Sequence, residues 1–116
     1  MADTYTYAFA APIRPGQTEA CRRMVAECLG PRRAEYADLQ RRCGVTAEAY
    51  WLQPGPDGDL LVVASDSDQA EFERIMADPQ TDFDRWFRDR VAEIFGADPA
   101  APSGPRNALL GEWRAA

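Results

Sequence analysis

The sequence predicts an α+β fold in which strands and helices follow one another in the order β, α, β, β, α, β. One observation that favours it is a run of large apolar residues at steps of three and four from Thr81 to Gly96, the spacing of one helix face. Another is a set of short apolar or alternating segments, which are typical of strands. The 116 residues suit a single domain, residues 1–116, that can bury a core without disulfides or metals.

The first half of the chain begins with a strand and continues with a helix. The strand is expected over residues 5–10, where aromatic residues alternate with smaller ones. The helix is expected over residues 18–44, and Gly30-Pro31 should interrupt it, because proline lacks a backbone donor and clashes with the preceding turn. The apolar stripe of this helix contains three cysteines, which suit ordinary core positions, with a reactive thiol as the alternative: Cys21, Cys28 and Cys43.

A hairpin is expected in the middle of the chain. The strands should cover residues 50–53 and 60–64, and the PGPDGD segment between them is a dense turn signal. The second of these strands is apolar throughout, which indicates that both of its faces are covered.

Two helices and a last strand complete the predicted order. The first helix should start at residues 66–68 and end at Asp78-Pro79, and the second should be capped by Thr81 or Asp82 and by Gly96. A Pro-rich connection over residues 97–107 follows, either as a lid over a pocket or as a surface segment. The last strand is expected over residues 108–113.

This order of elements is the ferredoxin-like βαββαβ arrangement, with a four-stranded antiparallel sheet. The helices can cover only one face of such a sheet, yet the strands carry more apolar residues than one face holds. A large exposed apolar face usually marks an interface or a ligand site. The simplest solution is a symmetric homodimer in which the free sheet faces pack together.

At this level the chain resembles the dimeric α+β barrel superfamily, which includes small antibiotic-biosynthesis monooxygenases, polyketide cyclases and muconolactone isomerase-like proteins. The resemblance is carried by the element order, by the I-R-P-G turn at residues 13–16, and by Y-W-L-Q-P at residues 50–54 together with F-D-R-W-F at residues 83–87. It implies a pocket between sheet and helices in each subunit. It also implies cofactor-independent oxygenation, cyclisation or isomerisation of an aromatic or polyketide-like molecule.

The absence of histidine excludes several kinds of chemistry. It rules out Ser-His-Asp and Cys-His catalysis and haem bound through an axial histidine, and it removes the commonest ligand of zinc, iron and copper. The three cysteines show no C-x-x-C spacing, so a zinc site and a disulfide framework are not expected. We therefore expect no metal and no cofactor.

The composition also restricts location and partners. A net charge of −6 without a basic block argues against binding to nucleic acid. The apolar runs are too short to span a membrane, and the first residues lack the pattern of a signal peptide. A cytoplasmic protein is the expectation, with itself and a small apolar or aromatic ligand as partners.

Phenols and one carboxyl group are the candidates for catalysis. Tyr7 and Tyr50 lie on predicted strands, where a phenol in a pocket can donate to a carbonyl or stabilise an enolate, with ordinary sheet core as the alternative. Glu112 lies on the last predicted strand and would be a base if buried, with exposure at a sheet edge as the alternative. Candidate ligand-binding residues are four aromatics and an arginine at a possible pocket mouth: Tyr5, Trp51, Trp86, Trp113 and Arg14.

Two functions remain open on these grounds. The first is an enzyme that encloses its substrate in an aromatic cavity, and the second is a non-catalytic ligand-binding or accessory protein that dimerises through its sheet. A cavity with a buried polar phenol or carboxyl would favour catalysis. A purely apolar cavity would favour binding, and a filled interior would favour a structural role.

Overall fold

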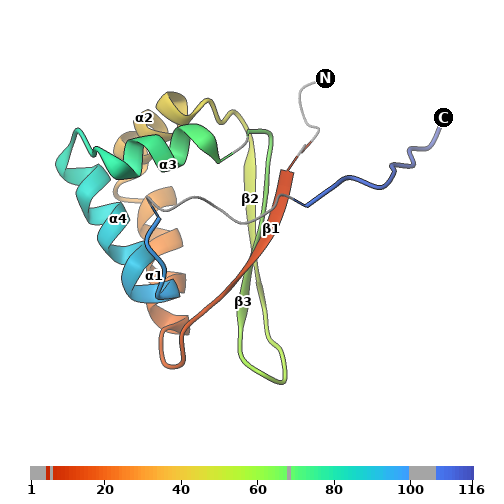
Figure 1. The fold of residues 1–116 in the computed structure, drawn as a ribbon, viewed down its shortest axis with the longest axis horizontal. Helices are drawn as coiled ribbons and strands as arrows, with labels where there is room; N and C mark the ends of the chain where they lie inside the picture. Colours follow the sequence, from red (N-terminus) through yellow and green to blue (C-terminus); the bar gives the residue numbers. More distant parts are fainter. Residues whose placement is uncertain (1–4, 6, 68, 100–106) are drawn as a thin grey trace.

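The computed structural model describes residues 5, 7–67, 69–99 and 107–116. Within these residues, helices form one layer and an antiparallel sheet forms the other, and the helices cover one face of the sheet only (Figure 1). The expected α+β class is confirmed. The elements are β1 (Tyr7–Pro12), α1 (Thr18–Leu29), α2 (Arg33–Cys43), β2 (Glu48–Gln53), β3 (Leu60–Ser65), α3 (Ala70–Ala77) and α4 (Asp82–Phe95).

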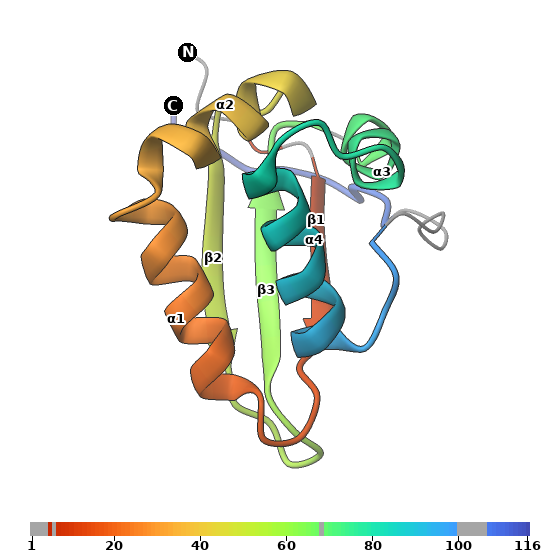
Figure 2. The same cartoon turned by 90° about the vertical axis from the view of Figure 1, so that its left-hand side faces the viewer.

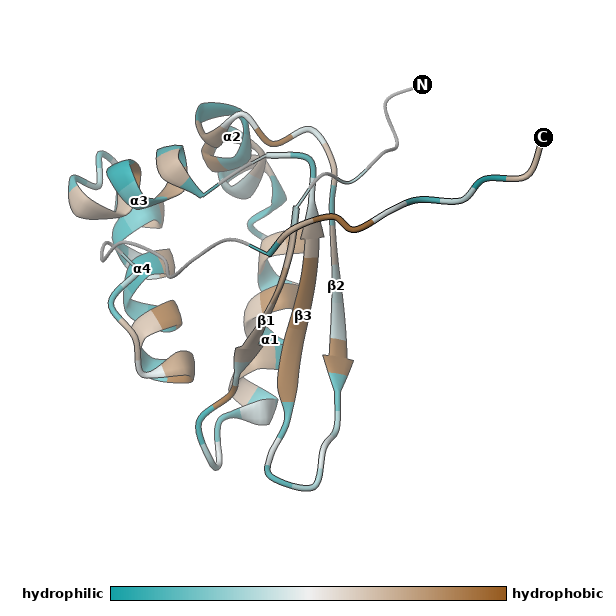
Figure 3. Ribbon diagram, turned by 45° about the vertical axis from the view of Figure 1, so that its right-hand side comes forward, coloured by the Kyte–Doolittle hydropathy of each residue, from teal (hydrophilic) through white to brown (hydrophobic). Residues whose placement is uncertain are grey.

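The described sheet has three strands in the order β1-β3-β2, with antiparallel neighbours. The expected hairpin of β2 and β3 is confirmed, and the apolar character of β3 is visible along its length in Figure 3. Figure 2 looks onto the helix layer and shows α1 and α4 in front of the sheet. Ser65 lies opposite both Tyr7 and Glu48, and directly opposed residues share a face. This row faces the helices, since Ser65 is buried.

The breaks and caps of the helices follow local sequence signals. α1 ends and α2 begins on either side of Gly30-Pro31, as expected, and a Cβ atom on Gly30 would lie 2.8 Å from the Ala26 carbonyl oxygen. The side chain of Thr81 accepts a hydrogen bond from the Asp84 N–H at 3.0 Å and caps α4. Gly96 ends the same helix in the left-handed conformation at φ +69°.

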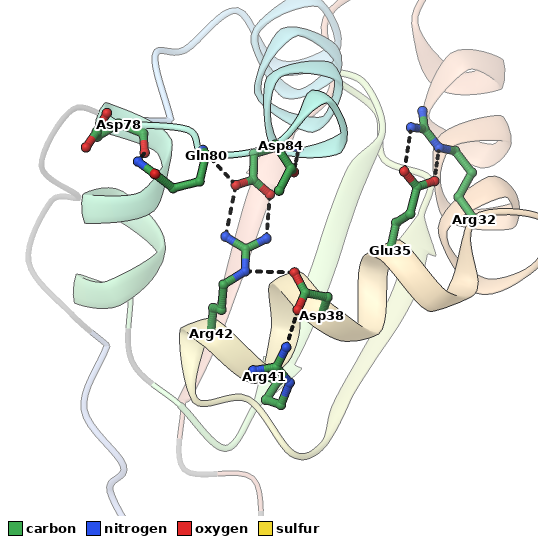
Figure 4. Close-up of polar contacts among 9 residues, drawn as sticks. Arg32, Glu35, Asp38, Arg41, Arg42, Asp78, Gln80 and Asp84 are labelled. Carbon is green, nitrogen blue, oxygen red and sulfur yellow. Dashed lines mark hydrogen bonds and ion pairs between the residues drawn. The ribbon is translucent and has the colours of Figure 1, made fainter.

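An ion pair joins α2 to α4 (Figure 4). The guanidinium of Arg42 donates to the two carboxylate oxygens of Asp84 at 2.7 and 2.9 Å, and its Nε donates to Asp38 at 2.9 Å. The Asp84 side chain is completely buried, and it also accepts the backbone N–H of Gln80 at 3.1 Å. This pair fixes the start of α4 against the end of α2.

The last strand expected from the sequence is not formed within this chain. Residues 107–116 are described without strand structure and leave the sheet as an extended segment (Figure 1). Leu109, Leu110 and Trp113 are strongly exposed. The four-stranded sheet is therefore not present in the described chain, which has three strands.

Two further expectations concern the ends of the chain. The first strand runs over Tyr7–Pro12 rather than residues 5–10, and Tyr5 lies outside it with 43% of its surface exposed. Whether the Pro-rich connection forms a lid concerns residues 100–106, which are outside the described residues.

Among the helices of the described ranges, none combines the length and apolar character needed to cross a lipid bilayer.

Candidate functional site

A cavity of about 520 Å³ lies between the inner face of the sheet and the helices. This volume is within the range of small-molecule sites, which are mostly apolar with a few polar groups. All three strands and all four described helices contribute to its lining. The lining is rich in aromatic rings: Tyr7, Phe9, Tyr36, Tyr50, Phe72, Phe87 and Phe95.

One wall of the cavity carries a polar cluster, here called the tyrosine–glutamate cluster: Tyr36, Gln40, Glu48 and Tyr50. The Tyr36 hydroxyl donates to Glu48 Oε1 at 3.1 Å, and the Tyr50 hydroxyl donates to the same oxygen. The two hydroxyls also contact each other. Gln40 Nε2 donates to Glu48 Oε1 at 2.7 Å, so three side chains converge on one carboxylate oxygen.

The spacing of residues within α2 and within β2 arranges these four groups as two pairs. Glu48 and Tyr50 are two residues apart on β2, so they share a face of the strand. Tyr36 and Gln40 are four residues apart on α2, so they share a face of the helix. Side-chain hydrogen bonds from Tyr36 and Gln40 of α2 to Glu48 of β2 then join both pairs into one network.

The environment keeps both phenols protonated. Burial raises the pKa of Tyr50 far above its ordinary value, and the Tyr36 hydroxyl and the Glu48 carboxylate raise this pKa further. Burial, followed by Glu48, likewise raises the pKa of Tyr36. At neutral pH the two phenols therefore act as hydrogen-bond donors and not as bases.

The three cysteines also line the cavity, and their thiols remain protonated. Burial raises the pKa of Cys28 to about 12 and that of Cys43 to about 11. It also raises the pKa of Cys21. Reactive cysteines have lowered pKa values, so these positions fit the core interpretation.

The cluster also borders a second hollow, of about 450 Å³, formed by α2, the α2–β2 loop and β2. Tyr36, Gln40, Glu48 and Tyr50 line both this hollow and the interior cavity. The cluster is thus the part of the cavity wall that the two hollows have in common.

The structure brings two of the residues singled out from the sequence into the cavity, namely Tyr7 and Tyr50. Trp51 lies on the outer face of the sheet, because neighbouring residues of a strand point to opposite faces, and 53% of its surface is exposed. Tyr5 is also exposed and does not line the cavity. Trp86 packs on Phe83 at a ring-centroid distance of 5.4 Å and lies outside the cavity lining.

The remaining candidates lie elsewhere. The Arg14 backbone N–H donates to the Ile94 carbonyl at 2.9 Å, and its guanidinium donates to the Glu93 carbonyl at 3.2 Å. Arg14 thus satisfies carbonyl groups at the end of α4 instead of lining a pocket mouth. Glu112 and Trp113 belong to the exposed last segment, where Glu112 pairs with Arg114 at 3.3 Å.

The sequence interpretation missed Tyr36, Gln40 and Glu48 as site residues. The E-x-Y spacing of Glu48 and Tyr50 was the available signal, since it places a carboxyl beside a phenol on one strand face. Tyr36 was recognisable as part of the apolar stripe of its helix. The contact between α2 and β2 that unites them has no local signature.

Among the described residues, no group of three or more Cys, Asp and Glu side chains is arranged to hold a metal ion. Comparisons of the chain with protein-family models, curated proteins and solved structures found no match.

Proposed function

We propose that this protein binds a small apolar or aromatic molecule in the interior cavity and catalyses a proton transfer on it. The observation that carries the proposal is a cavity of about 520 Å³ whose aromatic lining includes one polar cluster. Such a combination of apolar walls and a few convergent polar groups is typical of ligand sites.

The cluster has the groups needed to move a proton next to a carbonyl. Glu48 supplies a carboxylate that can accept a proton from the carbon adjacent to a ligand carbonyl. Once Glu48 carries the proton, Tyr36 or Tyr50 can turn its neutral hydroxyl from Glu48 to the oxygen of the resulting enolate and donate a hydrogen bond to it. In a conjugated enolate, return of the proton from Glu48 to a different carbon completes an isomerisation. Attack of the enolate carbon on a second carbonyl of the ligand, followed by return of the proton from Glu48 to the alkoxide that forms, gives a cyclisation.

These steps belong to the reactions that the barrel resemblance implies, and they need no cofactor. The apolar walls would shield a bound ligand from water and favour one orientation. A non-catalytic binding protein would need the cavity but not the paired phenols and carboxylate.

A proton-exchange assay with 2-tetralone tests this proposal. This aromatic ketone loses its acidic protons to D₂O through an enolate, and NMR follows the loss. The protein should accelerate the exchange, and Glu48→Gln should reduce the acceleration at least about 100-fold, the usual size of a general-base contribution. Glu19→Gln, which removes an exposed carboxylate of α1, should leave it unchanged.

Equal exchange rates with the native protein and with folded Glu48→Gln would contradict the proton-transfer step. Circular dichroism establishes that the variant is folded. Saturable binding of 2-tetralone without such acceleration would leave a binding protein in place of an enzyme.

We also propose that the protein is a homodimer in which the outer sheet faces pack together. Ala10, Val62 and Trp51 form a row across this face, because each lies opposite the next in the strand register. No described helix covers the row (Figure 1), and a half-exposed Trp in an apolar row is typical of an interface.

In this dimer we assign residues 108–113 to a fourth strand at the free edge of β1. The Ile13 N–H donates to the Asp59 carbonyl at 3.0 Å, and hydrogen-bonded pairs alternate along an antiparallel ladder. The backbone groups of Ala8 and Ala10 therefore point away from β3. The Asn107 side-chain amide already donates to the Ala8 carbonyl at this edge.

Light scattering after size exclusion tests the dimer. The native mass should be near twice 12.9 kDa, and Val62→Asp should give a folded monomer, because it places a charge in the middle of the outer face. A native protein that stays monomeric at all concentrations would overturn this part of the proposal.

A further inference from the structure

We propose that the ligand of the interior cavity carries a protonated amine on an apolar or aromatic body. This inference rests on the proposed function, which makes the cavity the ligand site, and it adds the charge of the ligand. The charge of the lining, the hydrogen bonding of Glu48 and the aromatic rings all support it.

Among the residues that the structure describes, the charged side chains that line the cavity are acidic: Glu48, Glu73 and Asp98. The chain contains 13 basic residues, yet none of the arginines in the described ranges lines the cavity. A carboxylate or phosphate on a ligand beside the cluster would therefore meet the like charge of Glu48, and the arginines that adjoin the cluster, Arg33 and Arg41, line the second hollow instead. The net charge of −6 adds a long-range attraction for cations and a repulsion for anions.

The hydrogen bonds of Glu48 are distributed unequally over its two oxygens. Oε1 accepts from Tyr36, Tyr50 and Gln40. Oε2 accepts no hydrogen bond from any residue that the structure describes. Since the described residues leave both lone pairs of Oε2 unused, one can accept an N–H group of the ligand and the other remains for the proton of the proposed transfer. A hydrogen bond between an ammonium and a carboxylate is among the stronger kinds.

Aromatic rings continue from the cluster into the cavity. The ring of Tyr36 stacks on Phe87 at a centroid distance of 5.8 Å, and Phe72 meets Phe87 edge-on at 6.0 Å. Ring faces attract organic cations, especially in a site shielded from water. An ammonium near Glu48 would thus have a carboxylate and aromatic rings around it, while the apolar body of the ligand packs along the remaining walls.

Three probes with one aromatic body separate charge from shape: 1-naphthylmethylamine, which is an ammonium at pH 7, neutral 1-naphthylmethanol and anionic 1-naphthoate. Isothermal titration of the full chain should give one site per subunit for the amine. The Kd of the amine should be at least about tenfold lower than that of naphthoate, equivalent to about 1.4 kcal/mol.

The variant Glu48→Gln locates the origin of this preference. It should raise the Kd of the amine about tenfold while changing that of the alcohol by less than about threefold. The exposed control Glu19→Gln removes the same charge from α1 and should leave all three values unchanged, which separates a local effect from the effect of net charge.

The outcomes distinguish this inference from the function on which it rests. Binding of naphthoate as tightly as the amine would overturn the ammonium inference and leave the cavity as a ligand site. An equal loss of amine affinity in Glu19→Gln would also overturn it. Failure of all three probes to bind would overturn the proposed function together with the inference.

Discussion

Replacement of Asp84 by Asn should lower the free energy of unfolding by about 2–4 kcal/mol. Asp84 is completely buried and accepts both Arg42 hydrogen bonds and the Gln80 N–H. Asparagine has a single acceptor oxygen and no charge. The guanidinium of Arg42 would therefore lose the negative charge of Asp84 and one of the two hydrogen-bond acceptors. Chemical unfolding followed by circular dichroism measures the loss.

The same ion pair predicts a dependence of stability on pH. Burial tends to raise the pKa of Asp84, but hydrogen bonds from Arg42 and the Gln80 N–H outweigh it and hold this pKa below its ordinary value of 3.8. The stabilisation is therefore complete above pH 3.8 and is lost as the pH falls through the lower pKa of the folded state. Asp84→Asn should remove this part of the acid sensitivity.

A matched control is available in the same helix turn. Asp82 pairs with Arg85 at 2.6 Å, but 97% of its side-chain surface is exposed. Since exposed ion pairs contribute little, Asp82→Asn should leave the stability at pH 7 nearly unchanged. Equal effects of the two substitutions would show that the buried pair does not hold α2 and α4 together.

Substitution of Val63 by Phe should abolish ligand binding while the protein stays folded. Val63 is buried, lies on the central strand and lines the cavity. A phenyl ring at this position extends into the empty volume instead of displacing core atoms. The Kd of 1-naphthylmethanol should increase at least about tenfold, or about 1.4 kcal/mol in binding free energy, as measured by isothermal titration.

Val62→Phe is a control for the added ring, because Val62 points to the opposite face of the same strand. It adds the same ring outside the cavity and should leave the Kd unchanged. The opposite face is the one proposed for the dimer, so light scattering should accompany the binding measurement. A cooperative unfolding transition would establish that Val63→Phe is folded. If the folded variant still bound the probe with the native Kd, the probe would have to bind outside the cavity.

Much of the fold could be predicted from signals that are local in the sequence. Gly30-Pro31 marked the helix break, Thr81 and Gly96 marked the ends of α4, and the turn before β3 marked the hairpin, because each is determined by backbone chemistry over a few residues. The segment at residues 108–113 has strand-like composition, but pairing depends on a partner surface that composition does not reveal.

The site was only half predictable for a similar reason. Tyr7 and Tyr50 were found because alternation along a strand assigns faces. Glu48 was not found, because its role depends on Tyr36 and Gln40 from α2. Their hydrogen bonds to Glu48 on β2 are tertiary contacts between distant parts of the chain. Glu112 and Trp113 were assigned to a site on the assumption of a fourth strand within the same chain.

The central claim is that the interior cavity is a small-molecule site, and methionine NMR tests it most directly. Met24 lines the cavity, whereas Met76 is fully buried outside its lining. With ¹³C-labelled methionine methyl groups, assigned through Met24→Leu and Met76→Leu, 1-naphthylmethanol should shift the Met24 signal saturably and the Met76 signal little. A Met24 signal that stays unchanged up to the solubility limit of the probe would contradict the claim.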